Sequence, residues 1–154
     1  MSKPDFVYVT YIETTPEKLW AALTQVELTK AYWPGHGPNS AHVNVSDWKP
    51  GSRWEHQQTN EAKTVDIVGK VIEASPPHRL VLSWSRPKEE ADVSKHSRAT
   101  FDIEPEGSVV RLTVTHDGLD PQMLAGISGG WPMVLSNLKT FLEQGRALPK
   151  PVWM

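Results

Sequence analysis

The 154-residue sequence predicts an α+β fold in which helices cover one side of an antiparallel sheet of about seven strands. Two observations predict it. From Ala41 to His116, short runs of alternating apolar and polar residues are separated by turn signals, which is typical of an antiparallel meander. From Pro121 to Gln144, apolar residues recur at helical spacing. A helix of that length, roughly 35 Å at about 1.5 Å per residue, needs a large apolar partner such as the sheet.

The first elements are a strand and a helix. Residues 6–13 (FVYVTYIE) are rich in β-branched and aromatic side chains and favour a strand, although both of its faces are apolar and the inward one stays open. Thr15 is suited to cap a helix, with Pro16 at its first position, and we expect this helix to end near Gln25. Its apolar stripe consists of Leu19, Leu23 and Val26, with Trp20 beside it.

A short second helix is expected within residues 26–33, before the prolines and glycines of residues 34–40 interrupt regular structure. Reversals of the chain are expected at Pro76 and Pro77, and at Glu106 and Gly107. We interpret the charged residues 86–98 as a solvated loop rather than a binding arm. The six strands of the meander are expected at HVNVSDW, SRWEHQ, TVDIVGKVIEA, RLVLSWS, SRATFDIEP and SVVRLTVTH.

The alternation in these strands predicts which side chains share one face of the sheet. Trp54 and His56 share a face of their strand, and we expect them on the same apolar side as the later strands. The later strands contribute Leu80, Leu82, Trp84, Ala99, Phe101, Ile103, Val110, Leu112, Val114 and His116.

The last helix is the longest amphipathic segment, and we expect Trp131 and Leu135 to face the sheet. Gly145 is suited to end it as a left-handed cap, and Pro149 prevents continuation. Three glycines within it each cost up to about 1 kcal/mol of helix propensity. Two interpretations stay open: the helix opens there to leave room for a ligand, or it packs closely on the sheet. The glycines are Gly126, Gly129 and Gly130.

Composition excludes several classes of function. The absence of cysteine excludes disulfides, thiolate metal sites and cysteine nucleophiles, and favours a cytoplasmic protein. The 16 Lys and Arg are scattered among 18 Asp and Glu, so nucleic-acid binding is not expected. No apolar run approaches the roughly 20 residues that span a bilayer, and no signal peptide is evident, so we expect no membrane insertion. We expect residues 1–154 to form a single domain.

Metal and cofactor chemistry is also not expected. The six histidines lack the spacings of common metal sites, and His36 and His42 are six residues apart across a Pro/Gly loop. The segment GISGG at 126–130 only superficially resembles a nucleophile elbow, which disfavours a hydrolase. The sequence therefore predicts neither a metal nor a cofactor.

Five segments together resemble a known family. They are TPEKLWAALT at 15–24, PGSRWEHQ at 50–57, GKVIEASPPHRLVLSW at 69–84, VVRLTVTHDGL at 109–119 and GGWPMVLSNLKTFLEQG at 129–145. They resemble the START-like superfamily, also called SRPBCC or birch-pollen-allergen-like, and within it bacterial proteins similar to the activator of heat-shock protein 90 ATPase. The resemblance implies a helix-grip fold, a strongly curved sheet wrapped around the C-terminal helix, with a cavity between them.

The resemblance leaves the function open, because the superfamily includes lipid carriers, hormone and alkaloid binders, aromatases, cyclases and co-chaperone domains. Our first hypothesis is non-catalytic binding of a hydrophobic or aromatic small molecule, lipid-like or polyketide-like, in that cavity. The second is an enzyme of the aromatase/cyclase or dehydratase type, with His116 and Asp117 as candidates. The third, taken from the family name alone, is a co-chaperone of a heat-shock ATPase.

The candidate ligand-binding residues are Trp33, Trp54, His56, Trp84, Phe101, His116, Trp131 and Leu135. Trp33 precedes a loop that would cover the cavity mouth or would only be anchored by the ring. His56 and His116 would fix a polar group of the ligand, or would be core histidines satisfied by the protein. Trp153 either folds back on the domain or enters a homodimer contact, and both alternatives stay open.

Overall fold

The computed structural model describes residues 4–35 and 40–149, and its seven strands form one antiparallel sheet in the order β1-β7-β6-β5-β4-β3-β2. From β2 to β7 each strand pairs with its neighbour in sequence, and β1 pairs with β7 at the far edge. The predicted meander is therefore confirmed. The strands are β1 (Phe6–Ile12), β2 (His42–Ser46), β3 (Arg53–Gln58), β4 (Val65–Ser75), β5 (Arg79–Trp84), β6 (Ser97–Glu106) and β7 (Val109–Asp117).

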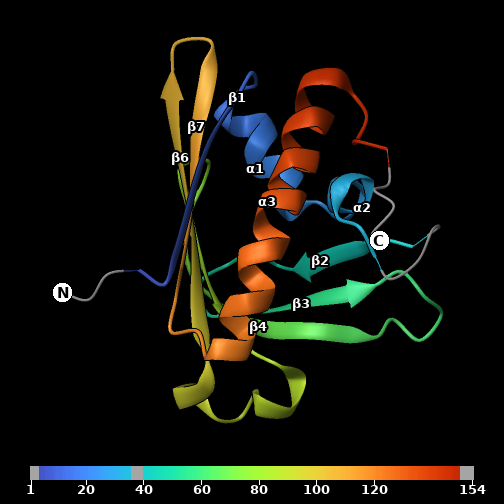
Figure 1. Ribbon diagram of the computed structural model, residues 1–154, viewed down its shortest axis with the longest axis vertical. Helices are drawn as coiled ribbons and strands as arrows, with labels where there is room; N and C mark the ends of the chain where they lie inside the picture. Colours follow the sequence, from blue (N-terminus) through green and yellow to red (C-terminus); the bar gives the residue numbers. More distant parts are fainter. Residues whose placement is uncertain (1–3, 36–39, 150–154) are drawn as a thin grey trace.

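The sheet curves strongly around the C-terminal helix α3 (Pro121–Gln144). Figure 1 shows β1, β6 and β7 as one arm, with β2, β3 and β4 turned across it beneath the helices. The pairing of β4 with β5 shifts register between Val71 and Glu73, and that of β3 with β4 shifts between His56 and Gln57. Such irregularities bend a strand and increase its twist. The predicted helix-grip fold is confirmed.

Gly69 in β4 allows an indole ring to lie over its backbone. Trp54 on β3 reaches across Gly69, and its Nε1–H donates a hydrogen bond to the Ser83 carbonyl of β5 at 2.8 Å. A Cβ at position 69 would lie 1.9 Å from that carbonyl oxygen. Since no side chain fits there, glycine is required for Trp54 to connect β3 with β5 in the curved region.

The two short helices begin and end where the sequence predicts. In α1 (Pro16–Thr24) the Thr15 hydroxyl accepts a hydrogen bond from the Lys18 amide at 3.2 Å, and α2 (Val26–Tyr32) follows directly. The predicted apolar stripe is wrong at one position. Val26 is 38% exposed, and Ala22 is buried beside Leu19 and Leu23 instead. The reason is that the backbone leaves the helix at Gln25, so the helical spacing does not continue to Val26.

The sequence did not decide which face of β1 points inward. In the structure, the outward face carries Val7, Val9 and Tyr11. These side chains are about half exposed, at 50%, 48% and 49%, while Ile12 on the inward face is buried. The described helices lie on the concave side of the sheet, so none of them covers this outer face of β1.

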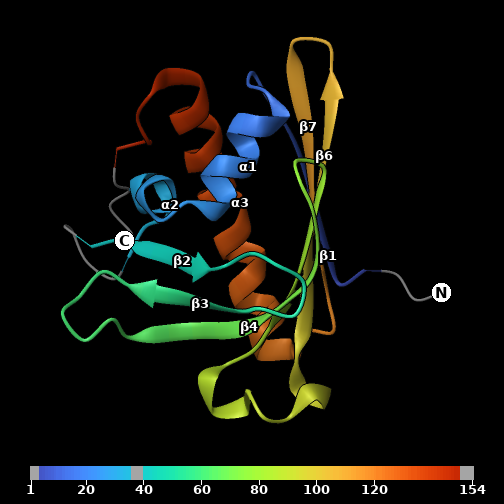
Figure 2. The same ribbon diagram turned by 180° about the vertical axis from the view of Figure 1, so that it is seen from behind.

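Helix α3 crosses the concave side of the sheet, as Figures 1 and 2 show from opposite sides. Its first turn is capped by the Asp120 carboxylate, which accepts from the Met123 amide at 2.7 Å, and Gly145 ends it in the left-handed conformation at φ 80°. The predicted bounds are confirmed. Pro132 lies within the helix. The buried residues of α3 are Ile127, Trp131, Val134, Leu135, Asn137 and Leu138.

Residues 85–96 connect β5 to β6 through two short 3-10 turns, η1 (Pro87–Glu89) and η2 (Val93–Lys95), and the last two residues of the predicted charged loop already belong to β6. Ion pairs tie this connection to the rest of the fold: Glu90 with Arg53 of β3 at 2.6 Å, and Arg86 with the cap Asp120 at 2.9 Å. The Arg86 guanidinium lowers the pKa of Asp120 to about 2.

Two predicted features, the spacing of His36 and the role of Trp153, lie outside the described residues. Among the helices that the structure describes, none is long and apolar enough to cross a membrane.

Candidate functional site

Aromatic rings from the sheet and the helices meet on the concave side of the sheet. Trp131 of α3 is at the centre, with its ring centroid 5.5 Å from Trp84, 5.7 Å from Phe101 and 5.7 Å from Trp33. The predicted face is confirmed, because the alternating residues of β5, β6 and β7 are buried against α3.

The eight candidate ligand-binding residues fall into two groups. Four of them line a pocket between α3, the sheet and the end of α2, namely Trp33, His56, Trp84 and Trp131. The other four are buried in the core around it and do not line it, namely Trp54, Phe101, His116 and Leu135.

The first group and its neighbours form what we call the aromatic pocket, with a volume of about 160 Å³. Its remaining walls are two glycines and aliphatic side chains from β4 and α3, and the indole N–H of Trp131 is directed away to His116. A dry cavity of about 150 Å³ is large enough for benzene. The pocket therefore has room for about one ring. The remaining lining residues are Ile67, Gly126, Ile127, Gly130 and Val134.

The glycines of α3 leave this space without breaking the helix. The helix is continuous through Gly126, Gly129 and Gly130, and a Cβ built on any of the three would meet no atom within 4 Å. The interpretation of close packing on the sheet is therefore wrong. Gly126 and Gly130 line the aromatic pocket, whereas Gly129 does not. The missing side chains, rather than an opened helix, provide the room.

His116 is fully buried, and the protein satisfies both of its ring nitrogens. Trp131 Nε1–H donates to Nδ1 at 3.2 Å, so the neutral ring carries its hydrogen on Nε2, which lies 2.8 Å from Ser97 Oγ. The Ser97 hydroxyl in turn donates to the Trp84 carbonyl at 3.1 Å. Burial lowers the pKa of His116 to about 4, with a smaller opposing effect of the Asp5 charge. The ring therefore stays neutral near pH 7.

Asp117 does not share the environment of His116. Successive residues of β7 alternate between the two faces, so Asp117 lies on the face away from α3 and is only half-buried. The suggestion that His116 and Asp117 act together on a molecule in the cavity is therefore wrong.

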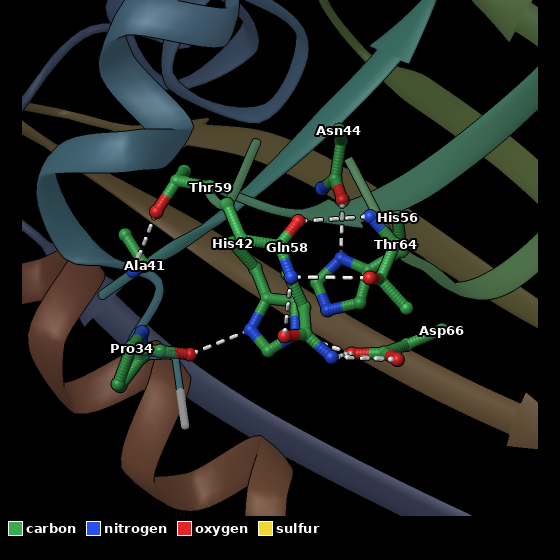
Figure 3. Close-up of polar contacts among 10 residues, drawn as sticks. Pro34, Ala41, His42, Asn44, His56, Gln58, Thr59, Thr64 and Asp66 are labelled. Carbon is green, nitrogen blue, oxygen red and sulfur yellow. Dashed lines mark hydrogen bonds and ion pairs between the residues drawn. The ribbon is translucent and has the colours of Figure 1, made fainter. Parts of the chain in front are cut away.

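His56 is the one ionisable side chain among the residues that line the aromatic pocket in the described part of the chain. Its Nδ1 lies 2.6 Å from the Oδ1 of Asn44 on the neighbouring strand β2 (Figure 3). An amide oxygen only accepts hydrogen bonds, so Nδ1 carries the hydrogen and the lone pair of the neutral ring is on Nε2. The Trp33 ring packs against the imidazole at 4.7 Å between centroids.

A second buried histidine stacks on His56. The His42 ring lies 4.3 Å from the His56 ring and nearly parallel to it, at 9°. His42 Nδ1 lies 2.7 Å from the Pro34 carbonyl oxygen, and Nε2 lies 2.7 Å from the Asp66 carboxylate (Figure 3). Both partners are hydrogen-bond acceptors, and together they hold the ring from its two sides. His42, Asn44 and Asp66 thus fix the orientation of this edge of the site.

Sequence reasoning missed these partners of His56. His42 and Asn44 alternate onto the face that His56 occupies, and neither metal-ligand spacing nor apolar periodicity singles them out. The signal that was available is the pairing of two short strands, in which Asn44 lies opposite His56. Within the described residues no group of three or more His, Cys, Asp or Glu side chains is arranged to hold a metal ion.

Comparison with known proteins identifies a family for most of the chain. The model of the family described as "Activator of Hsp90 ATPase homolog 1-like protein" matches residues 13–143. No curated protein matches the chain.

Solved structures share the fold at low sequence identity. CalU16 from Micromonospora echinospora is 21% identical with a TM-score of 0.70, over 93% of this chain and 76% of that one. An HSP90 activator from Plasmodium falciparum, PFC0360w, is 19% identical with a TM-score of 0.69, over 89% and 94%. An AHSA1-like protein from Aeromonas hydrophila is 18% identical with a TM-score of 0.67, over 88% and 91%.

Proposed function

The chain belongs to the family of activator of Hsp90 ATPase homolog 1-like proteins, and from this premise we propose that it binds a small hydrophobic or aromatic molecule in the aromatic pocket. The observation that carries the proposal is a space walled by three indoles and kept open by two helical glycines. Gly126 is exposed and Gly130 is half-buried, so the pocket opens at the surface of α3 and a ligand can reach its aromatic walls. The glycines also lower the helix propensity of α3, and the packing of the fold alone does not offset this loss.

The volume of the pocket narrows the class of ligand. Sites for drug-sized molecules occupy roughly 300–1,000 Å³. At about 160 Å³ the aromatic pocket holds one ring or a similar apolar group, and not a whole fatty acid or a fused polyketide. If the ligand is lipid-like or polyketide-like, we therefore expect only one ring or one similar apolar group of it to occupy the pocket.

Titration with toluene tests this proposal. The probe is added to ¹⁵N-labelled protein, and the indole N–H signals of Trp33, Trp84 and Trp131 are followed by NMR. Saturable shifts of these three signals are expected, because all three rings line the pocket. The other indole signals should move little.

A pair of glycine variants supplies the control. Gly130→Leu places a side chain in the aromatic pocket, whereas Gly129→Leu places the same side chain one residue away, outside it. Both should stabilise the helix by up to about 1 kcal/mol, so loss of fold does not confound the comparison. Toluene should bind Gly129→Leu like the wild type and Gly130→Leu at least about tenfold more weakly. Equal binding to both, or no saturable shift in the wild type, would contradict the proposal.

A second candidate function is proton transfer on the bound molecule. The observation in its favour is His56, which lines the pocket and whose Nδ1–H is held by Asn44, an arrangement that orients an imidazole for general acid or base catalysis. This replaces His116, whose ring nitrogens are both bonded within the core. Any turnover of a bound aromatic molecule should be lost in His56→Gln while binding persists. Turnover that survives the substitution would eliminate His56.

Action on a heat-shock chaperone stays a prediction from the family description. The Plasmodium falciparum protein carries that activity in its name, but 19% identity to it supports the fold alone. Capture of the purified chaperone by this protein, with a measurable change in its ATPase rate, would support this role.

A further inference from the structure

A second pocket lies on the other side of Trp33. It has a volume of about 140 Å³ and lies between the end of α2, α3 and the segment that follows α3. Trp33 lines both this pocket and the aromatic pocket, so the two pockets are adjacent at this residue. Beside apolar residues, the lining of the second pocket includes the polar side chains of Lys30, Ser40 and Asn137. We call it the polar pocket.

Asn137 is the feature of the polar pocket that the fold does not explain. It lies on the buried face of α3 with only 5% of its surface exposed, yet among residues 4–35 and 40–149 no hydrogen bond to its amide exists. The Asn137 amide is not among the fully buried side-chain atoms that lack a hydrogen-bond partner, so it is open to the polar pocket rather than sealed in the core. The amide group is therefore suited to a partner from outside the chain.

The charge of the polar pocket indicates what that partner is. Lys30 is the one charged side chain among the described residues that line it, and it forms no ion pair within the described chain. The hydroxyl of Tyr32, another wall residue, already donates to the Ala22 carbonyl at 2.9 Å. The amide N–H₂ of Asn137 and the ammonium of Lys30 both donate hydrogen bonds, and an anion with two oxygens accepts from both.

We propose that the polar pocket binds the carboxylate of an aromatic acid whose ring occupies the aromatic pocket. This inference depends on the proposed function, since the ring anchors the molecule. The two pockets together provide roughly 300 Å³, the lower end of the range for small-molecule sites. A ring with a short carboxylate side chain is a molecule of that size.

The Trp33 side chain has to move for such a molecule to occupy both pockets, and the structure allows this movement. Its backbone is held on both sides, by Trp33 N–H to the Thr29 carbonyl at 3.0 Å and by His42 N–H to the Trp33 carbonyl at 2.9 Å. Its half-buried indole, in contrast, makes no hydrogen bond within the described residues and is held by ring contacts alone. A change of rotamer at Trp33 therefore breaks no hydrogen bond of the side chain.

Three probes test the proposal: toluene, propylbenzene and 3-phenylpropanoate, titrated by NMR into the wild type and Asn137→Leu. Toluene should bind both proteins within about twofold, which also shows that the variant is folded. In the wild type, 3-phenylpropanoate should bind more tightly than propylbenzene. In Asn137→Leu it should bind at least about tenfold more weakly, because a charge-assisted hydrogen bond is lost.

Lys30→Gln provides a second measurement. The variant should bind 3-phenylpropanoate about threefold more weakly at low salt and bind propylbenzene with unchanged affinity. The reason is that an exposed ammonium contributes modestly to binding and is screened by salt. If toluene binds but 3-phenylpropanoate binds the wild type and Asn137→Leu equally, the polar pocket is not a carboxylate site and the proposed function stands. If toluene itself does not bind, the proposed function fails and this inference fails with it.

Discussion

Acidification should destabilise the protein through His116. The unfolded chain binds a proton at this residue near pH 6.5, whereas the folded protein takes it up only near pH 4. Between these values the unfolded state binds more protons, so stability falls as the pH falls through this window. At about 1.4 kcal/mol for each pH unit, the loss amounts to about 3 kcal/mol by pH 4. Protonation also places a hydrogen on Nδ1, opposite the Trp131 N–H that now donates to it.

The measurement is urea unfolding, followed by tryptophan fluorescence, at pH 7, 6, 5 and 4. The control is His116→Gln, whose amide can accept from Trp131 and donate to Ser97 but does not titrate. Contributions from other carboxylates and histidines are common to both proteins and cancel in the difference. The stability of the wild type relative to the variant should decrease by about 3 kcal/mol between pH 7 and pH 4. A difference that is constant with pH would refute the assignment of a buried neutral imidazole.

Four further substitutions have expected outcomes. Thr15→Ala should lower the free energy of unfolding by about 1 kcal/mol in urea, because the cap of α1 is lost. Gly129→Ala should raise it by up to about 1 kcal/mol, whereas Gly107→Ala, at φ 66°, should lower it by a similar amount; opposite signs in thermal melts check both. Trp33→Ala should join the two pockets, so naphthalene should bind more tightly than toluene in NMR titrations, reversing the wild-type order.

The sequence predicted the walls of the site well because alternation and helical spacing are local properties. Period-two alternation assigned Leu80, Phe101 and Leu112 to the buried face, and Thr15 and Gly145 marked helix ends through their own backbone preferences. These predictions depend on a few neighbouring residues. They needed no knowledge of which side chains meet across the fold.

The pocket itself could not be predicted in this way. Whether Trp33 or Trp54 faces empty space depends on how rings from four elements pack, and periodicity gives faces but not distances. Gly126 and Gly130 were recognised as unusual, but their meaning depended on what lies opposite them. Asn137 is a further signal in the sequence, because this polar side chain interrupts the apolar face that Val134, Leu135 and Leu138 form on α3. The sequence predictions do not include it.

The middle of α3 has a consequence for how a ligand enters. Gly126, Gly129 and Gly130 are poor helix formers, and Pro132 has no N–H to donate to the Ser128 carbonyl. The helix is thus locally weakest where it faces the aromatic pocket, while the turns near Leu138 are held in the core. Opening of this segment alone would admit a molecule without unfolding the sheet. Native-state hydrogen exchange should therefore be faster at residues 127–131 than at residues 134–138, and ligand binding should slow it there first.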